Sequence, residues 1–150
     1  MASLQHYPGS FLMPSLGHAN VSDAMHPGVL FCEPEATLTD VARIMATNHV
    51  HCVVVTGVMH GAPMGPLGWG MVTDLEVLRA GIRDGAEPTA GELAQQPLIG
   101  VEPSMPLREA VELMLAHGVS HLVVVQPGSQ RPIGILSTAD VAGVIAWGEA

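Results

Sequence analysis

The sequence contains no lysine, and its five arginines face 14 acidic residues, which gives the 150 residues a formal net charge of −9. Proteins that bind nucleic acid usually present a basic surface that displaces counterions from the phosphates. The charge balance therefore disfavours a nucleic-acid partner. A small anionic ligand is still compatible with it, because backbone amides at a helix N-terminus can hold a phosphate group without basic side chains.

Long apolar runs are also missing, although 48% of the residues are hydrophobic and the mean hydropathy is +0.37. The strongest apolar strings, such as 52–55 and 122–125, have the length of a strand, whereas a bilayer span needs about 20 apolar residues. No lysine or arginine precedes Arg43, so the N-terminal segment does not resemble a signal peptide. We therefore predict no membrane association and a cytoplasmic location.

Cysteine is represented only by Cys32 and Cys52, which are too few for a disulfide framework and lack the Cys-x-x-Cys spacing. We predict that both are small buried residues. His49 and His51 would share one face of a strand, but no third ligand is identifiable, so no metal site is predicted. The sequence also offers no nucleophile paired with a base, and we predict that the protein is not an enzyme.

The most informative feature of the sequence is an internal repeat. Cys32 falls on Val101 at an offset of 69 (101 − 32 = 69), and downstream the offset drops to 64, where Gly70 falls on Gly134. The five-residue difference lies in residues 57–69, a predicted hairpin loop, which is an ordinary place for an insertion. The other matches are Glu33-Pro34 with Glu102-Pro103, Leu38 with Leu107, Asp40 with Glu109, Met45 with Met114, Val54-Val55 with Val123-Val124, Thr73 with Ser137, and Glu76 with Asp140.

Each copy is predicted to fold as strand, helix, strand, strand, helix, which places the chain in the α/β (α+β) class. Thr37 with Asp40 forms a capping box, Pro106 suits a first helical position, and Gly118 suits a C-terminal cap. The second helices are expected to begin at Asp74 and Thr138. The predicted strands are 29–33, 50–56 and 70–73 in the first copy, and 98–102, 119–126 and 134–137 in the second copy.

The composition also predicts how the chain is divided. Residues 1–19 are rich in glycine, proline and serine and are predicted to form an irregular N-terminal arm. The first repeat unit is assigned to 20–82, the linker to 83–89, and the second unit to 90–148.

Each copy resembles the CBS domain, named after cystathionine β-synthase, and the tandem resembles a Bateman module of the small stand-alone bacterial type. The resemblance is carried by Asp23-Ala24-Met25, by the string 119–125, and most of all by Gly134-Ile135-Leu136-Ser137-Thr138-Ala139-Asp140. It implies two β-α-β-β-α units packed sheet to sheet with pseudo-twofold symmetry, and a homodimer. It also implies AMP, ADP, ATP or S-adenosylmethionine as the ligand, with no required cofactor.

The resemblance assigns roles in a first cleft. In the family, the aspartate of this element binds the ribose hydroxyls, which assigns Asp140 to ribose and Ser137 with Thr138 to phosphate or ribose. A hydroxyl and a carboxylate at a helix start suit such a ligand, because the helix dipole favours anions and a carboxylate accepts charge-assisted hydrogen bonds. The resemblance further implies that Leu30 and Phe31 complete this cleft against adenine, with His51 and Cys52 nearby.

A second cleft is implied by the other copy, with Thr73, Glu76, Ile99, Gly100, Ser120 and His121 as its residues. Glu76 stands where the family has aspartate, and the extra methylene would misalign a contact to both ribose hydroxyls. His121 could face phosphate, whereas Cys52 holds the matching place in the first cleft. We therefore favour the Asp140 cleft, although His121 argues for the other one.

Two functions stay open at this point. The first is a regulatory or sensory module that binds an adenosyl nucleotide. The second is a ligand-free CBS dimer that acts as a structural or protein-interaction scaffold, in which Ser-x-x-Asp merely caps a helix. The sequence does not identify a downstream protein partner.

Overall fold

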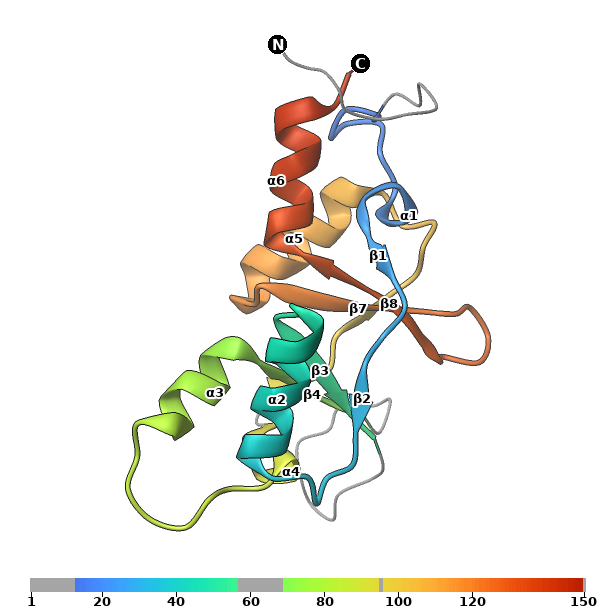
Figure 1. The fold of residues 1–150 in the computed structure, drawn as a ribbon. Coiled ribbons are helices and arrows are strands. Elements are labelled where there is room, and N and C mark those ends of the chain that lie inside the picture. Colours follow the sequence, from blue (N-terminus) through green and yellow to red (C-terminus); the bar gives the residue numbers. More distant parts are fainter. Residues whose placement is uncertain (1–12, 57–68, 95, 150) are drawn as a thin grey trace. The chain divides into compact units, whose positions relative to one another are not determined.

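The computed structural model describes residues 13–56, 69–94 and 96–149, and in this part the chain forms six helices and two four-stranded sheets (Figure 1). The predicted hairpin loop falls almost wholly in 57–68, outside the described residues. The predicted α/β class is confirmed, and each copy follows the predicted order of strand, helix, strand, strand, helix. Each copy is also preceded by a short helix and a two-residue strand that the sequence analysis did not include.

The chain divides into two compact units. We call Gly28–Gly100 the central unit, and the residues up to Pro27 together with those from Val101 onward the terminal unit.

The central unit contains the sheet β2-β3-β4-β5. β2 (Phe31–Cys32) pairs in parallel with β3 (Cys52–Val55), and β4 (Gly70–Thr73) lies antiparallel to β3 and to β5 (Gln96–Pro97). Every residue of β3 and β4 is buried, as expected for continuous apolar strands in the middle of a sheet. The unit's helices are α2 (Leu38–Asn48), α3 (Asp74–Gly81) and α4 (Ala90–Leu93), and all three contact one another.

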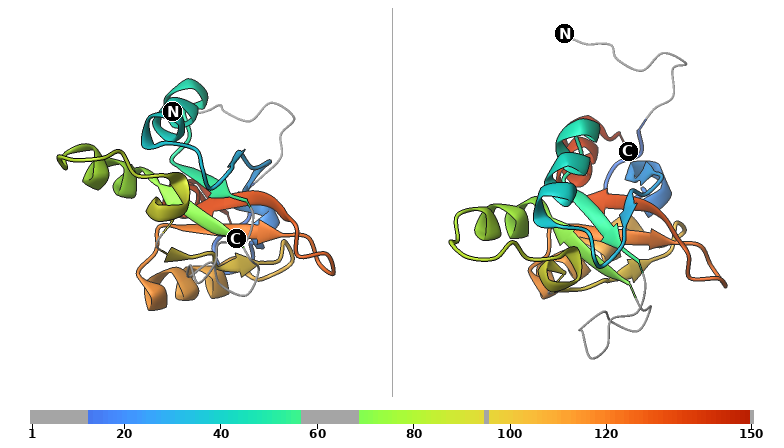
Figure 2. Two further views of the ribbon diagram at one scale, coloured as in Figure 1. Left: turned by 90° about the horizontal axis from the view of Figure 1, so that it is seen from below. Right: turned by 60° about the horizontal axis from the view of Figure 1, so that its bottom comes forward.

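The terminal unit contains the sheet β1-β8-β7-β6. Its centre is the antiparallel hairpin of β7 (His121–Val125) and β8 (Pro132–Ser137), whose turn extends beyond the sheet (Figure 2). β1 (His26–Pro27) pairs antiparallel with β8, and β6 (Gly100–Val101) flanks β7. The helices are α1 (Val21–Ala24), α5 (Leu107–His117) and α6 (Thr138–Trp147), and α1 contacts both of the others.

The two copies exchange their opening elements. α1 and β1 precede the first copy in sequence but pack with the second, whereas α4 and β5 precede the second copy and pack with the first. The same anchoring hydrogen bond recurs at the repeat offset: Val21 N donates to Met105 O (2.9 Å), and Ala90 N donates to Ala36 O (2.6 Å). The boundaries 20–82 and 90–148 therefore describe the sequence repeat, while each compact unit joins segments of both copies.

The ends of the long helices follow local sequence signals. The predicted capping box is confirmed at α2, where Thr37 Oγ1 accepts from Asp40 N and Asp40 Oδ2 accepts from Thr37 N, both at 3.1 Å. The prediction for Pro106 was one residue off: it is the N-cap of α5, and Leu107 is the first helical residue. Gly118 ends α5 in the left-handed region (φ 63°), as predicted, and His49 has the same conformation (φ 55°) at the end of α2.

Part of the predicted irregular arm is tied to the other end of the chain. Ser15 N donates to Glu149 O (2.7 Å), and Glu149 N donates to Met13 O (2.8 Å). The predicted linker is also attached to its own unit, because Glu87 Oε2 accepts hydrogen bonds from the amide and the hydroxyl of Thr39 near the start of α2. A carboxylate at this position is favoured by the helix dipole.

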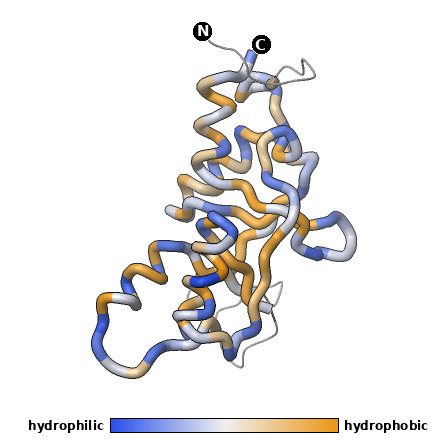
Figure 3. The backbone as a smooth tube through the Cα atoms, viewed as in Figure 1, coloured by the Kyte–Doolittle hydropathy of each residue, from blue (hydrophilic) through white to orange (hydrophobic). Residues whose placement is uncertain are grey.

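The apolar strands form the core of each unit, and the segment between α3 and α4 is largely hydrophilic (Figure 3).

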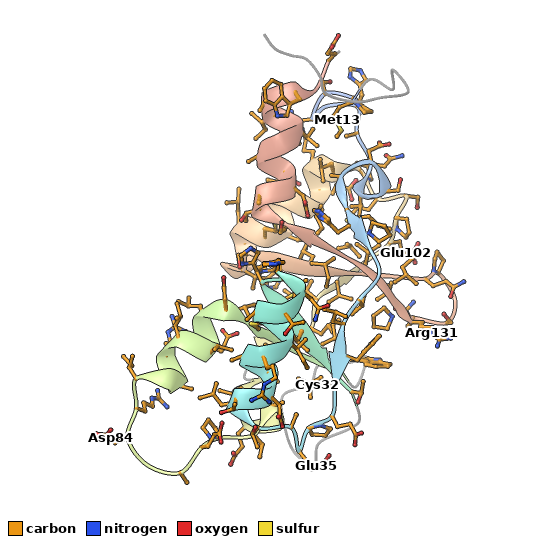
Figure 4. The ribbon with its side chains drawn as sticks, in the orientation of Figure 1. Met13, Cys32, Glu35, Asp84, Glu102 and Arg131 are labelled. Atoms are coloured by element: carbon orange, nitrogen blue, oxygen red, sulfur yellow. The ribbon has the colours of Figure 1, made fainter. Side chains whose placement is uncertain are left out.

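Cys32, labelled on β2 in Figure 4, and Cys52 are both buried free thiols, as predicted. Burial, with a smaller contribution from nearby carboxylates, raises the pKa of Cys32 to about 11 and that of Cys52 to about 12. Among the described residues, no helix combines the length and the apolar character that crossing a bilayer requires.

Candidate functional site

The element with the strongest functional prediction lies where β8 ends and α6 begins. Ser137 is extended and caps the helix: its Oγ accepts from Asp140 N (3.2 Å), while its own amide donates to Asp140 Oδ2 (2.8 Å). This reciprocal capping box explains why a serine and an aspartate three residues later end the strand and start the helix here. It also fixes the carboxylate over the N-terminus of α6, where the helix dipole favours negative charge.

Both oxygens of the Asp140 carboxylate have protein donors. Oδ2 accepts a second hydrogen bond from Ser137 Oγ (3.0 Å), and Oδ1 lies 2.8 Å from His26 Nδ1 on β1. The Asp140 side chain is only 6% exposed, whereas that of His26 is 76% exposed. The matching capping box at Thr37 and Asp40 has an exposed carboxylate, so burial separates Asp140 from an ordinary cap.

The start of β7 completes this part of the terminal unit. Strand pairing sets His121 opposite Ser137, and Thr138 N donates to Ser120 O (3.0 Å). His121 is buried, and its Nδ1 lies 2.9 Å from Ser120 Oγ. The sequence assigns Ser120 and His121 to the second cleft, with Glu76. Within the terminal unit the hairpin register sets them beside Ser137 and Thr138, and their assignment to a cleft stays a prediction.

The central unit has an equivalent element at the start of α3. Thr73 N and Thr73 Oγ1 both donate to Glu76 Oε1 at 2.6 Å. Cys52 is paired with Thr73 across the sheet, and Asp74 N donates to His51 O (2.9 Å), as Thr138 N does to Ser120 O. His51 and Asp74 also form an exposed side-chain pair, 3.1 Å apart.

The remaining predicted residues lie on or beside the edge strands. Leu30 precedes β2 and accepts from Val54 N through its carbonyl (2.9 Å). Phe31 is 41% exposed, and its ring centroid lies 5.8 Å from that of Trp69. Ile99 is half-buried and Gly100 exposed at the start of β6. The two predicted clefts combine residues of both units, and they stay predictions.

Two residues of this region were missed by sequence reasoning. His26 reaches Asp140 because β1 pairs with β8, a contact between residues 114 positions apart (140 − 26 = 114) that no local pattern predicts. Trp69 directly precedes β4, and its ring packs against that of Phe31 because the sheet brings the two distant segments together.

Within 13–56, 69–94 and 96–149, no three His, Cys, Asp or Glu side chains are grouped so as to hold a metal ion.

The central unit contains two cavities. His49, His51 and Asp74 line one of about 430 Å³ between α2 and α3. A larger cavity of the same unit, about 810 Å³, lies among α3, α4 and the segment that joins them, where Asp84 lies (Figure 4).

Sequence comparison identifies the family. The model of the CBS domain matches residues 21–62 and 90–146, one match in each copy, which together make up most of the chain. The chain belongs to the CBS domain family. The CBS-domain chain is 29% identical over 126 residues to hypoxic response protein 1 of Mycobacterium tuberculosis, which covers 80% of each protein. It is 30% identical over 129 residues to the CBS domain-containing protein YhcV of Bacillus subtilis, which covers 83% of this chain and 84% of YhcV.

Solved structures agree on a CBS domain pair. The pair of protein MJ0100, in complex with 5'-methylthioadenosine and S-adenosyl-L-methionine, superposes with a TM-score of 0.70 at 16% identity, over 85% of this chain and 96% of that one. CBSX2 in complex with AMP superposes with a TM-score of 0.65 at 20% identity, over 85% of this chain and 96% of that one. Hypoxic Response Protein I with two coordinated zinc ions superposes with a TM-score of 0.62 at 26% identity, over 83% of this chain and 98% of that one.

Proposed function

We propose that this CBS pair is a regulatory module that binds an adenosyl nucleotide, AMP, ADP, ATP or S-adenosylmethionine, through the Asp140 carboxylate. The observation that carries the proposal is the buried carboxylate of Asp140, held at the N-terminus of α6 beside Ser137. A ribose presents two neighbouring hydroxyl donors, and an ionised carboxylate accepts from both with charge-assisted strength.

The surroundings of Asp140 suit the rest of such a ligand. Thr138 is exposed at the first position of α6, and the start of β7 contributes Ser120 and His121 from the neighbouring strand. Adenine would then be contacted by Leu30 and Phe31, as the family resemblance implies. The complexes of MJ0100 and CBSX2 support an adenosine-containing ligand, because the ligands named for both contain adenosine.

Thermal unfolding with each of the four nucleotides tests the proposal. A ligand that binds the native state raises the melting temperature, and 100 times its Kd stabilises by about 2.7 kcal/mol. We expect a shift for at least one nucleotide in the wild type and a loss of that shift in Asp140→Asn. The substitution keeps the side-chain size but replaces a charged acceptor.

The matched control is Asp40→Asn, because Asp40 occupies the same position of a capping box on α2 and is exposed. It should lose a similar small amount of stability, about 0.5–2 kcal/mol, while keeping the nucleotide response. Glu76→Gln reports on the second element. If no nucleotide shifts the wild-type transition at millimolar concentration, the proposed binding function is wrong.

A second candidate function, a dimeric scaffold, is favoured by exposed apolar side chains on helices. Leu75 and Leu78 on α3 and Ile82 at its C-cap are 49%, 65% and 88% exposed. Ile145 and Trp147 on α6 are each 66% exposed. Such surface commonly marks a protein interface, and we propose that it serves a homodimer. Light scattering should give twice the monomer mass for the wild type and a smaller mass for Leu78→Asp, and a monomeric wild type would rule out the scaffold.

A further inference from the structure

We infer that His26 is an internal competitor for the Asp140 carboxylate, which must release Oδ1 before a ribose can bind there. The inference rests on the proposed nucleotide site and concerns its regulation. Asp140 Oδ2 already accepts from Ser137 N and Ser137 Oγ, and Oδ1 lies 2.8 Å from His26 Nδ1. These three contacts take three of the roughly four acceptor sites of the carboxylate. A ribose that donates both hydroxyls to Asp140 needs two sites, so one protein donor has to leave, and the exposed imidazole is the least tightly held of the three.

The His26 ring can leave at little cost in packing. Its side chain is 76% exposed, so rotation into solvent gives up few contacts, whereas the carboxylate that it covers is 6% exposed. The residue lies on β1, an edge strand of two residues, and Gly28 follows with φ +89°. A contact made by an exposed side chain on a short edge strand suits a reversible cover better than a fixed structural pair.

The other copy shows that the capping geometry does not require such a cover. At Thr73 and Glu76, Oε1 takes both threonine donors, and among the described residues Oε2 accepts no hydrogen bond. The capping geometry at Thr73 and Glu76 therefore forms without an imidazole on the second carboxylate oxygen.

Only molecules in which His26 has released the carboxylate can bind the ribose, so the apparent affinity is the intrinsic affinity multiplied by the fraction of such molecules. Removing the imidazole should bring this fraction close to one and so raise the apparent affinity. We expect His26→Ala to bind the nucleotide that responds best in the wild type about 3- to 10-fold more tightly, and His26→Gln to show a smaller gain. His18→Ala, which removes an exposed histidine of the same unit that contacts Ser15 Oγ (2.9 Å), should leave the Kd unchanged.

Isothermal titration of these variants separates the outcomes. Tighter binding by His26→Ala, including binding that appears only in this variant, supports the competitor. Equal or weaker binding by His26→Ala, when the wild type binds, overturns the competitor and leaves the nucleotide site standing. Binding by neither protein refutes the nucleotide site, and the competitor with it.

A ligand-free measurement tests the contact itself. The ¹⁵N resonance of His26 Nδ1 should move when Asp140 is replaced by asparagine, because the charged acceptor is lost. An unchanged resonance would mean that the imidazole does not occupy Oδ1 in solution and would overturn the inference whatever the titrations give.

Discussion

Gly134→Ala tests whether the exchanged strand β1 is held by close backbone approach to β8. A Cβ atom at position 134 would lie 2.7 Å from His26 O, and ordinary contacts begin near 3.4 Å, so β1 would have to withdraw by 0.7 Å (3.4 − 2.7 = 0.7). The other near atoms, Cε and Sδ of Met25 at 3.3 and 3.4 Å, belong to a flexible side chain and can yield. The carbonyl oxygen of His26 cannot yield in this way, because it belongs to the backbone of the paired strand.

The magnitude follows from overpacking and from the pairing that is lost. Overpacking costs about 1–3 kcal/mol, and a weakened backbone hydrogen bond adds about 1 kcal/mol. Alanine also lowers the conformational entropy of the unfolded chain, which stabilises the folded protein by about 0.4–1 kcal/mol. We expect a net loss of about 1–3 kcal/mol in the free energy of unfolding, or roughly 3–10 °C in Tm for a chain of this length.

Urea denaturation and calorimetry measure this loss. Gly143→Ala is the matched control, because Gly143 lies inside α6 and an added Cβ would meet no atom within 4 Å. Alanine is favoured over glycine in a helix interior, so this variant should gain about 0.5–1 kcal/mol. If Gly134→Ala is as stable as the wild type, β1 does not lie where the structure has it.

Three further outcomes are expected. His49→Gly should stabilise the protein by about 1 kcal/mol, because His49 adopts the left-handed conformation (φ 55°) that Gly118 adopts in the other copy, and urea denaturation should register the gain. Cys32 and Cys52 should resist iodoacetamide at pH 8 until the protein unfolds, because burial raises the pKa of both thiols, and alkylation of either thiol in the native protein would contradict this expectation. The free energy of unfolding should also fall as the pH rises above 9.0, because the thiols ionise first in the unfolded chain. A fragment of residues 20–89 should lack cooperative unfolding in circular dichroism, because the central sheet takes β5 from the second copy, and a sharp transition would show that the exchange is dispensable.

Local and periodic features of this chain could be predicted from the sequence. The offset of 69 aligned strands and helices that the structure confirms, and hydroxyl residues three positions before a carboxylate marked helix starts correctly at Thr37, Thr73 and Ser137. These signals are readable because a capping box closes within four residues. The strands were predicted too long at several ends, since apolar residues continue beyond the paired segment.

Long-range placement could not be predicted in the same way. The pairing of β1 with β8 joins distant segments, and without it His26 is an unremarkable histidine after a short helix. The pairing of His121 with Ser137 was within reach of the sequence, because an antiparallel hairpin with a short turn brings these two residues opposite each other. Which cleft Ser120 and His121 line depends on both units and stays a prediction.

A nucleotide titration monitored by ¹H–¹⁵N correlation spectra tests whether the Asp140 carboxylate binds the ribose. We expect saturating AMP, ADP, ATP or S-adenosylmethionine to move the amide resonances of Ser137, Thr138 and Asp140, and to leave those of Thr37 and Asp40 in place. These two groups share the same capping geometry, so the comparison separates a ligand site from a helix cap. Resonances that stay unchanged at Asp140 with every nucleotide would contradict the assignment of this carboxylate to ribose.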